Sequence, residues 1–251
     1  MSFSDDEIRR KISSVPVWYH KIPIRSGIVT PGITDPTVTL GLLDLPADCQ
    51  GKRVLDLGTR DGFFAFELER RGAEVVATDY MPMEKTGFQV VAELLGSKVR
   101  YLQANIYHLS PERLGTFDIV LFLGLLYHLP DPMQALEIVR SLCREEMYLE
   151  THAIDNAVLL GDGRSVPLRE LSPVLAEVPL MQFYPGRSLN NDPTNYWGPN
   201  LRCLVEMLRE RRFAVVSHKF NGNRAIVRSR TIEDPELEYF NQIAHGVLAR
   251  A

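Results

Sequence analysis

One short segment, residues 54–64 with the sequence VLDLGTRDGFF, constrains the fold more than any other. An apolar, strand-forming run ends at Gly58, and a second apolar segment follows Gly62, with Phe64 and Leu68 four residues apart. This order indicates a strand, a tight turn and a helix. Glycine lets a backbone approach a ligand closely, and the first turn of a helix has unpaired N–H groups. The turn is therefore a candidate ligand-binding loop.

A second acidic position follows the loop at a characteristic distance. Asp79 ends the apolar run 74–78, seventeen residues after Gly62. An acid at the tip of a second strand, about 20 residues after such a loop, is placed to accept hydrogen bonds from ribose hydroxyls. The dinucleotide spacing G-x-G-x-x-G fails, because Arg60 occupies the position of the second glycine. A nucleoside ligand without a pyrophosphate is favoured, and an NAD-dependent dehydrogenase is the weakest alternative.

The remaining chain predicts an α/β fold with a doubly wound, Rossmann-like parallel sheet, because strands and helices alternate after residue 50. We expect strands at 53–57, 74–78, 99–104, 117–123 and 146–151, and helices at 62–71, 84–95, 110–114 and 132–143. A helix capped by Asn200 and two strands, 213–220 and 225–228, complete seven strands. The turn Asn221-Gly222-Asn223 joins the last two strands into a β-hairpin.

The loop motif resembles the first motif of the class I S-adenosylmethionine (AdoMet) methyltransferases. Residues 55–62 match its pattern of hydrophobic-Asp-hydrophobic-Gly-x-x-x-Gly, and a closing hairpin is the ending expected of that family. There the first-strand acid and the glycines hold the methionine part, and the second-strand acid holds the ribose. The resemblance implies AdoMet as cofactor, with contacts from Asp56, Gly58, Thr59, Arg60, Gly62 and Asp79. Around the adenine we expect Tyr80, Met81, Asn105 and Ile106.

A third motif, residues 123–128 with the sequence LGLLYH followed by Asp131-Pro132, makes the resemblance more specific. It is similar to a run in the tRNA wobble-uridine (mo5U34) methyltransferase family, and the similarity extends over roughly residues 50–215. It implies that Leu123, Gly124 and Tyr127 contact the cofactor. That family's lysine and arginine contacts to a carboxylated cofactor have no secure counterpart here, and Lys21 and Arg25 are candidates for them. The arm around Tyr19-His20 is more similar to shorter relatives that use ordinary AdoMet on small acceptors.

Three histidines are candidate bases for a hydroxyl acceptor, because an aliphatic hydroxyl is a poor nucleophile and histidine titrates near neutral pH. They are His20, His128 and His152, and Glu150 or Asp155 is a candidate to orient one of them. Glu150, His152, Asp155 and Asn156 also have the chemistry of Mg²⁺ ligands. We expect no metal, since no second group of ligands accompanies them.

We expect a single methyltransferase domain over residues 1–251. Its parts are an N-terminal arm 1–47, a core 48–152 and 200–230, an insert 153–199 and a C-terminal helix 231–251. Loops as long as the insert are usually functional. We expect the insert and the arm to cover a small polar acceptor, with aromatic contacts from Trp18, Tyr19, Tyr184, Tyr196 and Trp197.

Charge and targeting signals narrow the partners. The formal net charge is −4, so the chain lacks the general positive field that attracts nucleic acid. Three separated cysteines and the lack of a signal-peptide or membrane-span segment predict a cytoplasmic protein. A tRNA wobble methyl or carboxymethyl transferase stays the main alternative to a small-molecule enzyme. A catalytically silent AdoMet-binding partner protein is the second alternative.

Overall fold

The computed structural model describes residues 3–244, and the chain forms two compact units, residues 1–122 and residues 123–251. Each unit has its own buried apolar residues and its own sheet strands. The single-domain organisation inferred from the sequence stays a prediction.

Unit 1 is built on parallel strands in the order β6-β3-β4-β5. Their bounds are β3 Arg53–Leu57, β4 Glu74–Asp79, β5 Arg100–Gln103 and β6 Phe117–Leu123. In β3, every residue after Arg53 is buried, which is typical of a parallel strand covered on both faces. Asp56 pairs with Ala77 in β4 and with Leu121 in β6, so β3 has a strand on each side.

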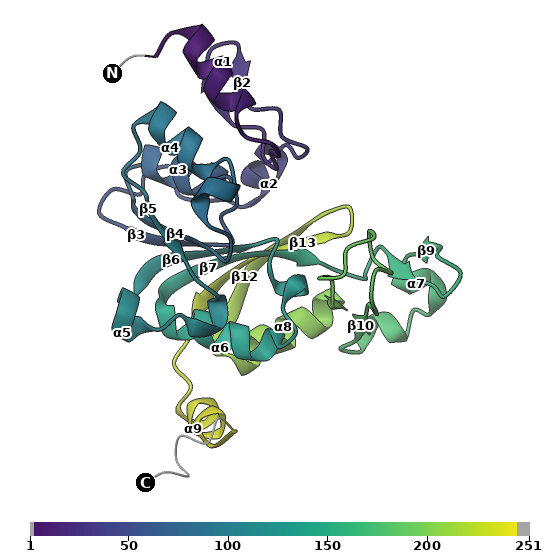
Figure 1. Cartoon of the computed structure of the whole chain (residues 1–251). Coiled ribbons are helices and arrows are strands. Elements are labelled where there is room, and N and C mark those ends of the chain that lie inside the picture. Colours follow the sequence, from purple (N-terminus) through teal and green to yellow (C-terminus); the bar gives the residue numbers. More distant parts are fainter. Residues whose placement is uncertain (1–2, 245–251) are drawn as a thin grey trace. The chain divides into compact units, whose positions relative to one another are not determined.

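Helices cover both faces of these strands, as expected for a doubly wound sheet (Figure 1). α3 (Phe63–Arg70) and α4 (Phe88–Leu95) lie on one face and α5 (Pro111–Leu114) lies on the other, with short 3₁₀ turns η1 (Met83–Lys85) and η2 (Ile106–His108). The single helix expected over 84–95 is wrong, because η1 and α4 are separate. Gly87 N–H donates to a carboxyl oxygen of Asp61 at 2.9 Å, and Thr86 between them is extended.

The N-terminal arm begins with a helix and continues as a loop that is held by hydrogen bonds between its own residues. α1 (Asp5–Ser13) starts at a capping box in which Ser4 accepts from Glu7 N–H and Glu7 accepts from Ser4 N–H. A short hairpin follows, β1 (Pro23–Arg25) with β2 (Ile28–Val29). Part of the arm is more regular than expected, since α2 (Thr37–Leu42) begins directly after Pro36, whose φ of −76° suits a helix start.

Unit 2 contains three antiparallel strands in the order β12-β13-β7. They are β7 Cys143–His152, β12 Phe213–Asn221 and β13 Arg224–Thr231, and the expected closing hairpin is confirmed. α6 (Pro132–Leu142) and α8 (Leu201–Glu210) lie along one face of these strands, and η3 (Leu126–His128) precedes α6 (Figure 1). Asp131 and Asn200 cap the two helices through Gln134 N–H and Cys203 N–H, as the sequence predicts.

The insert 153–199 folds as a small lobe of unit 2 (Figure 1). Its elements are β8 Val158–Leu159, β9 Ser165–Val166, α7 Leu168–Leu171, η4 Leu175–Glu177, β10 Met181–Phe183 and β11 Trp197–Pro199. Ile154, Leu168, Tyr184 and Leu189 form its core. Each element is only two to four residues long, which explains why the sequence shows no periodicity here.

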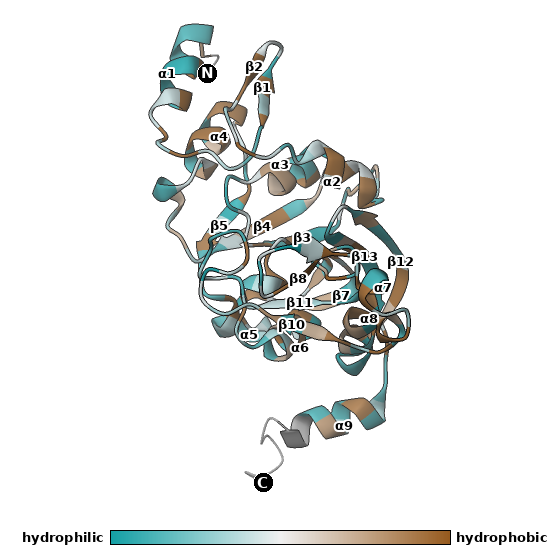
Figure 2. Ribbon diagram, turned by 90° about the vertical axis from the view of Figure 1, so that its right-hand side faces the viewer, coloured by the Kyte–Doolittle hydropathy of each residue, from teal (hydrophilic) through white to brown (hydrophobic). Residues whose placement is uncertain are grey.

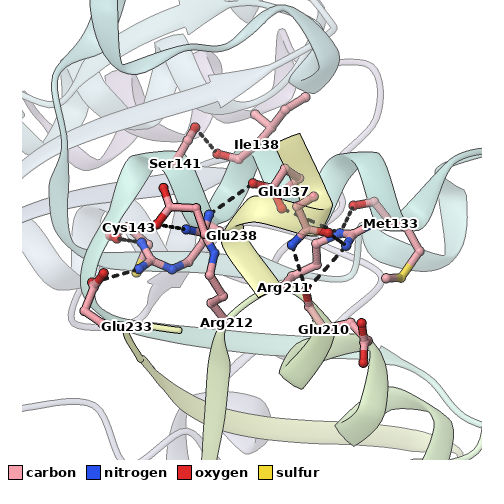
Figure 3. Close-up of polar contacts among 12 residues, drawn as sticks. Met133, Glu137, Ile138, Ser141, Cys143, Glu210, Arg211, Arg212, Glu233 and Glu238 are labelled. Atoms are coloured by element: carbon pink, nitrogen blue, oxygen red, sulfur yellow. Dashed lines mark hydrogen bonds and ion pairs between the residues drawn. The ribbon is translucent and has the colours of Figure 1, made fainter. Parts of the chain in front are cut away.

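The C-terminal helix α9 (Pro235–Ala244) is held on unit 2 by charged contacts (Figure 3). Arg212 pairs with Glu137 of α6 and with Glu238 of α9, both at 3.2 Å. Arg211 donates to Asn241 of α9 and Arg140 pairs with Glu233. Figure 2 shows α9 with alternating hydrophilic and hydrophobic bands. Residues 245–251 of the helix expected over 231–251 lie outside the described residues.

Candidate functional site

The expected site residues fall in both units. Unit 1 carries the candidate cofactor loop, the acids at the strand ends and the arm residues. Unit 2 carries Leu123, Gly124, Tyr127, His128, His152, Tyr184, Tyr196 and Trp197.

The loop between β3 and α3 is rigidly hydrogen-bonded. Gly58 N–H and Thr59 N–H both donate to the carbonyl of Thr78, at 2.8 and 3.0 Å. Gly58 has φ of +72° and Gly62 has φ of +91°, a region that favours glycine. A Cβ on Gly62 would lie 2.4 Å from the ring of Phe66, so packing also requires glycine there. The loop is thus preformed at the carboxyl end of β3.

Asp56 is buried beneath this loop. Its carboxylate accepts from the Thr59 hydroxyl at 2.7 Å and from Ala65 N–H in the first turn of α3. Burial, with a further contribution from the Asp79 charge, raises the pKa of Asp56 to about 6, although the Thr59 hydrogen bond opposes this. Asp56 therefore stabilises the loop through hydrogen bonds from Thr59 before Gly62 and from Ala65 after it.

Asp79, at the end of β4, has the chemistry of a ribose acceptor. One carboxyl oxygen accepts from Arg60 N–H and the other from Met81 N–H, each at 3.0 Å. Each carboxylate oxygen has a second lone pair for a further donor. Arg60 has φ of +54°, and that conformation aims its N–H at Asp79. A pair of ribose hydroxyls fits this donor and acceptor set.

Two of the residues expected around an adenine, Tyr80 and Asn105, line an open part of unit 1. Tyr80 is 71% exposed, and a hollow of about 640 Å³ extends from it past Gln103 and Asn105. Asn105 is exposed and its carbonyl oxygen caps η2 through Tyr107 N–H. Ile106 is buried, and Met81 contacts the Arg60 guanidinium through its sulfur. An exposed aromatic ring beside an amide is suited to a flat heterocycle.

The arm residues are mostly internal. Trp18 is 4% exposed, and its indole N–H donates to the Ile12 carbonyl at 3.0 Å. His20 packs against the rings of Tyr19, Phe63 and Phe64, and burial lowers its pKa to about 4. Its Nδ1 is buried with no hydrogen-bond partner among the described residues. Trp18 and His20 therefore stabilise the arm, and Tyr19, which is half-buried, is the arm residue best placed to meet an acceptor.

His128 is oriented by two residues of the insert. Its Nδ1 lies 3.2 Å from the carbonyl of Thr194 and 2.9 Å from the Thr194 hydroxyl. That hydroxyl donates to Asp192 at 2.7 Å, so both oxygens act as acceptors toward His128. Nδ1 must then carry the proton, which leaves the lone pair on Nε2. Burial lowers the pKa of His128, so the imidazole is neutral at pH 7.

Arg224, which sequence analysis missed, lies beside Tyr127. Its guanidinium donates to the Tyr127 hydroxyl at 2.9 Å, stacks 4.5 Å from the Tyr127 ring centre and pairs with Glu150 at 3.2 Å. Burial raises the pKa of Glu150, and Arg224 opposes that rise. The pairing of β13 with β7 brings Arg224 to this place, because the residue after the 221–223 turn pairs with His152 at the end of β7. Gly124 N–H donates to the Glu150 carbonyl, and its φ is +66°.

The other candidates of unit 2 attach the insert. His152 Nε2 lies 2.8 Å from the Tyr184 hydroxyl, and both residues are at most 3% exposed. Burial, together with Arg224, lowers the pKa of His152 to about 4. Tyr196 N–H donates to the Tyr127 carbonyl, and the Trp197 indole donates to the Pro130 carbonyl. Tyr196 and Trp197 are half-buried and remain candidates for acceptor contact.

The side-chain contacts do not support two of the expected roles, the orientation of a histidine by Glu150 or Asp155 and the cofactor contact of Arg25. Glu150 pairs with Arg224 and Asp155 accepts from Leu201 N–H at 2.8 Å, so neither orients a histidine. Arg25 is tied to Asp5 in the arm at 2.9 Å. Within residues 3–244 no group of three metal-ligating side chains is present, and no helix there is long and apolar enough to cross a membrane.

Comparison with known proteins gives the family. A family model described as a methyltransferase domain matches residues 38–217. The tRNA U34 carboxymethyltransferase of Chromohalobacter salexigens is 26% identical over 191 residues, 73% of this chain and 51% of that protein. The ubiquinone biosynthesis O-methyltransferase of Aliivibrio fischeri is 33% identical over 94 residues, 38% of this chain and 39% of that protein. The chain thus spans about half or less of the length of these curated relatives.

Solved structures agree on the fold. The N-terminal domain of EvdMO1 with SAH bound matches with a TM-score of 0.63 at 21% identity, covering 93% of this chain and 98% of that one. An S-adenosylmethionine dependent methyltransferase from Mesorhizobium loti matches with a TM-score of 0.54 at 17% identity, covering 78% and 96%. The predicted recognition and fold class are confirmed. The chain belongs to the methyltransferase domain family and has the class I methyltransferase fold.

Proposed function

We propose that this protein is an AdoMet-dependent methyltransferase that methylates a hydroxyl group of a small polar acceptor, with His128 as the general base. The observation that carries the proposal is the chain from Asp192 through Thr194 to His128 Nδ1. It selects the tautomer whose Nε2 lone pair can take a proton. A hydroxyl needs such a base, whereas an amine or a thiolate acceptor does not.

Unit 1 supplies the donor site. Asp79 accepts from the ribose hydroxyls, the loop 58–62 contacts the methionine part, and Tyr80 with Asn105 contacts the adenine. When bound, AdoMet supplies an electrophilic methyl group on a good leaving group. The protein's own contribution is then positioning, exclusion of water and removal of one proton.

The pKa direction of His128 supports its role. Burial lowers that pKa below its usual value, so the base is already neutral at pH 7. Partial burial acts to raise the pKa of Asp192, but hydrogen bonds from Thr194 hold it below its usual value, so Asp192 is ionised. An ionised Asp192 accepts a hydrogen bond from the Thr194 hydroxyl. The hydroxyl oxygen is then the acceptor toward His128 Nδ1. His20 and His152 lack such an arrangement.

The test compares His128→Ala with Thr194→Val in an assay that measures SAH formation on a panel of low-molecular-weight alcohols, phenols and sugars. His128→Ala should leave AdoMet affinity unchanged and lower turnover by about 10²–10⁴. Thr194→Val should lower turnover less and should weaken the dependence of turnover on pH below 7. Unchanged turnover in both variants would exclude His128 as the base. AdoMet binding without turnover on any acceptor would favour the silent partner protein.

A second candidate function, carboxymethyl transfer to tRNA, is favoured by Arg224. A carboxylate on the transferred group needs a cation beside it, and Arg224 presents one next to Tyr127. Glu150 already pairs with that cation, which argues for ordinary AdoMet. Calorimetry with AdoMet and with its carboxylated derivative decides between them. A preference for the derivative that is lost in Arg224→Gln, with salt-sensitive binding of unmodified tRNA, would establish the second candidate.

A further inference from the structure

The cofactor loop carries a buried acid that none of the expected roles uses. Asp61 is 1% exposed, and its carboxylate accepts three backbone hydrogen bonds. Tyr19 N–H and His20 N–H donate to one oxygen at 2.7 and 2.8 Å, and Gly87 N–H donates to the other at 2.9 Å. One side chain therefore joins the arm, the loop and the start of α4.

The part of the arm that Asp61 holds is assembled by its own hydrogen bonds. Thr30 Oγ1 donates to the His20 carbonyl and accepts from Ile22 N–H, both at 2.7 Å. Thr34 N–H and Oγ1 both donate to the Tyr19 carbonyl. Gly32 lies so close to His20 that a Cβ would be 2.0 Å from the His20 carbonyl carbon. Residues 19–34 therefore behave as one preformed loop.

The arm contacts the rest of unit 1 at several points, and Asp61 is the buried carboxylate among them. The His20 ring also packs on Phe63 and Phe64 of α3. The Trp18 ring packs on Gly87, where a Cβ would lie 2.1 Å from it. Lys11 pairs with Glu93 at 2.8 Å, but this pair is largely exposed and contributes little. Hydrogen bonds to a buried carboxylate are stronger than neutral ones, and their loss leaves buried N–H groups without acceptors. Asp61 therefore fixes the backbone N–H groups of Tyr19 and His20.

Asp61 is also one residue from a contact of the expected ribose acceptor. Arg60 N–H donates to Asp79 at 3.0 Å, and Gly62 N–H donates back to the Thr59 carbonyl at 2.8 Å. A ligand that fixes Asp79 thus fixes the Arg60 peptide, and with it the backbone that carries Asp61. The path from Asp79 to the Tyr19 N–H runs through two adjacent residues of one loop.

We propose that Asp61 is a positioning residue that couples occupation of the cofactor loop to the order of the arm, so that binding of AdoMet further restricts Tyr19 on the acceptor side. The proposal rests on the proposed function in one respect, namely that the loop 58–62 contacts AdoMet. It gives the arm a defined role, which is to complete the acceptor side after the cofactor has bound.

The experiment is hydrogen exchange of the full chain, measured by mass spectrometry with and without SAH, for wild type and two variants. Asp61→Asn keeps the size of the side chain, but its amide turns an N–H toward backbone donors. Asp35→Asn is the matched control, because Asp35 is an exposed arm carboxylate that bonds only to Thr37. Urea titration of each protein separates a loss of global stability from a loss of coupling.

In wild type and in Asp35→Asn, SAH at 100 times its Kd should slow exchange in residues 15–34 by up to about 100-fold, the limit for full coupling. In Asp61→Asn, SAH should still protect residues 55–65, while protection of the arm should fall below about twofold. Equal arm protection in Asp61→Asn, or none in wild type, would overturn the proposal. Should Asp61→Asn fail to fold, a lack of arm protection in wild type would still overturn the proposal. Lack of protection at residues 55–65 in wild type would instead refute the cofactor site.

Discussion

Asp56 should make the stability of this protein fall as the pH rises from 4 to 6. The carboxyl group is buried under the loop, and its pKa is raised from 3.8 to about 6, chiefly by burial. In that pH range the folded state binds a proton that the unfolded state has released. Since ∂ΔG/∂pH of unfolding follows the difference in bound protons between unfolded and folded states, the free energy of unfolding decreases with pH.

The magnitude follows from the size of the shift. Two pKa units at 1.36 kcal/mol each give about 3 kcal/mol. The stabilisation is fully present below the unfolded pKa of 3.8 and is lost as the pH rises through the folded value near 6. Above that pH both states are ionised and the contribution is constant. Asp56→Asn does not titrate, so its stability lacks this component.

The assay is urea unfolding of wild type and Asp56→Asn at pH values from 4 to 8. The difference between their free energies of unfolding cancels the other titrating groups. Relative to the variant, wild type should lose about 2.4 kcal/mol of the roughly 3 kcal/mol between pH 4 and pH 7, because the unfolded state is already more than half ionised at pH 4. Thr59→Val provides a second check, because it removes the hydroxyl that stabilises the carboxylate and should move the midpoint above pH 6. A difference that stays constant, or that grows with pH, would refute the assignment.

Three further predictions address the two units separately. Asp79→Ala should weaken AdoMet binding by about 1.5–3 kcal/mol in calorimetry, the scale of a hydrogen bond to a charged group, and unchanged affinity in a folded protein would place the ribose elsewhere. Gly58→Val should abolish AdoMet binding, and retained binding would mean that the loop is not the methionine site. Because Gly58 has φ of +72°, the substitution should also lower the free energy of unfolding in urea by about 1–3 kcal/mol. Arg224→Gln should destabilise unit 2 by about 2–3 kcal/mol at pH 8. The loss should become smaller as the pH falls, because burial raises the pKa of Glu150 and a protonated Glu150 no longer pairs with Arg224; a pH-independent loss would exclude that ion pair as the cause.

The parts of the fold that follow from local sequence were predictable. Apolar runs ending in glycine located β3 and β4, and the side-chain caps Asp131 and Asn200 located α6 and α8. The helix break at Gly87 was not predictable, because its cause is a hydrogen bond from Gly87 to Asp61, 26 residues earlier. The secondary structure of the insert was also not predictable, because its elements are too short to show a hydrophobic period. Its core is formed by contacts between residues that are distant in the sequence.

The candidate site likewise has residues that local sequence predicts and residues whose role depends on long-range contacts. Asp79 and the loop glycines were located by their spacing alone, because a strand and a turn bring them to one edge. Arg224 was missed because its partners, Tyr127 and Glu150, lie about 97 and 74 residues away in the sequence and only the strand register brings it to them. Asp61 was assigned to the turn, but its role depends on backbone N–H groups that no sequence pattern reveals.

The choice among the three histidines shows why partners matter more than residue type. All three have the same intrinsic pKa, and burial lowers each one. His20 Nδ1 is enclosed by aromatic rings, and His152 Nε2 is occupied by the Tyr184 hydroxyl in the core of the insert. His128 alone of these has a carbonyl and a hydroxyl, both acting as acceptors, at one ring nitrogen, which fixes the proton there and leaves the opposite nitrogen basic. Because Thr194 and Asp192 belong to the insert, displacement of the insert would release the His128 tautomer. Under the proposed function, deprotonation of the acceptor then depends on the same segment that is expected to cover it.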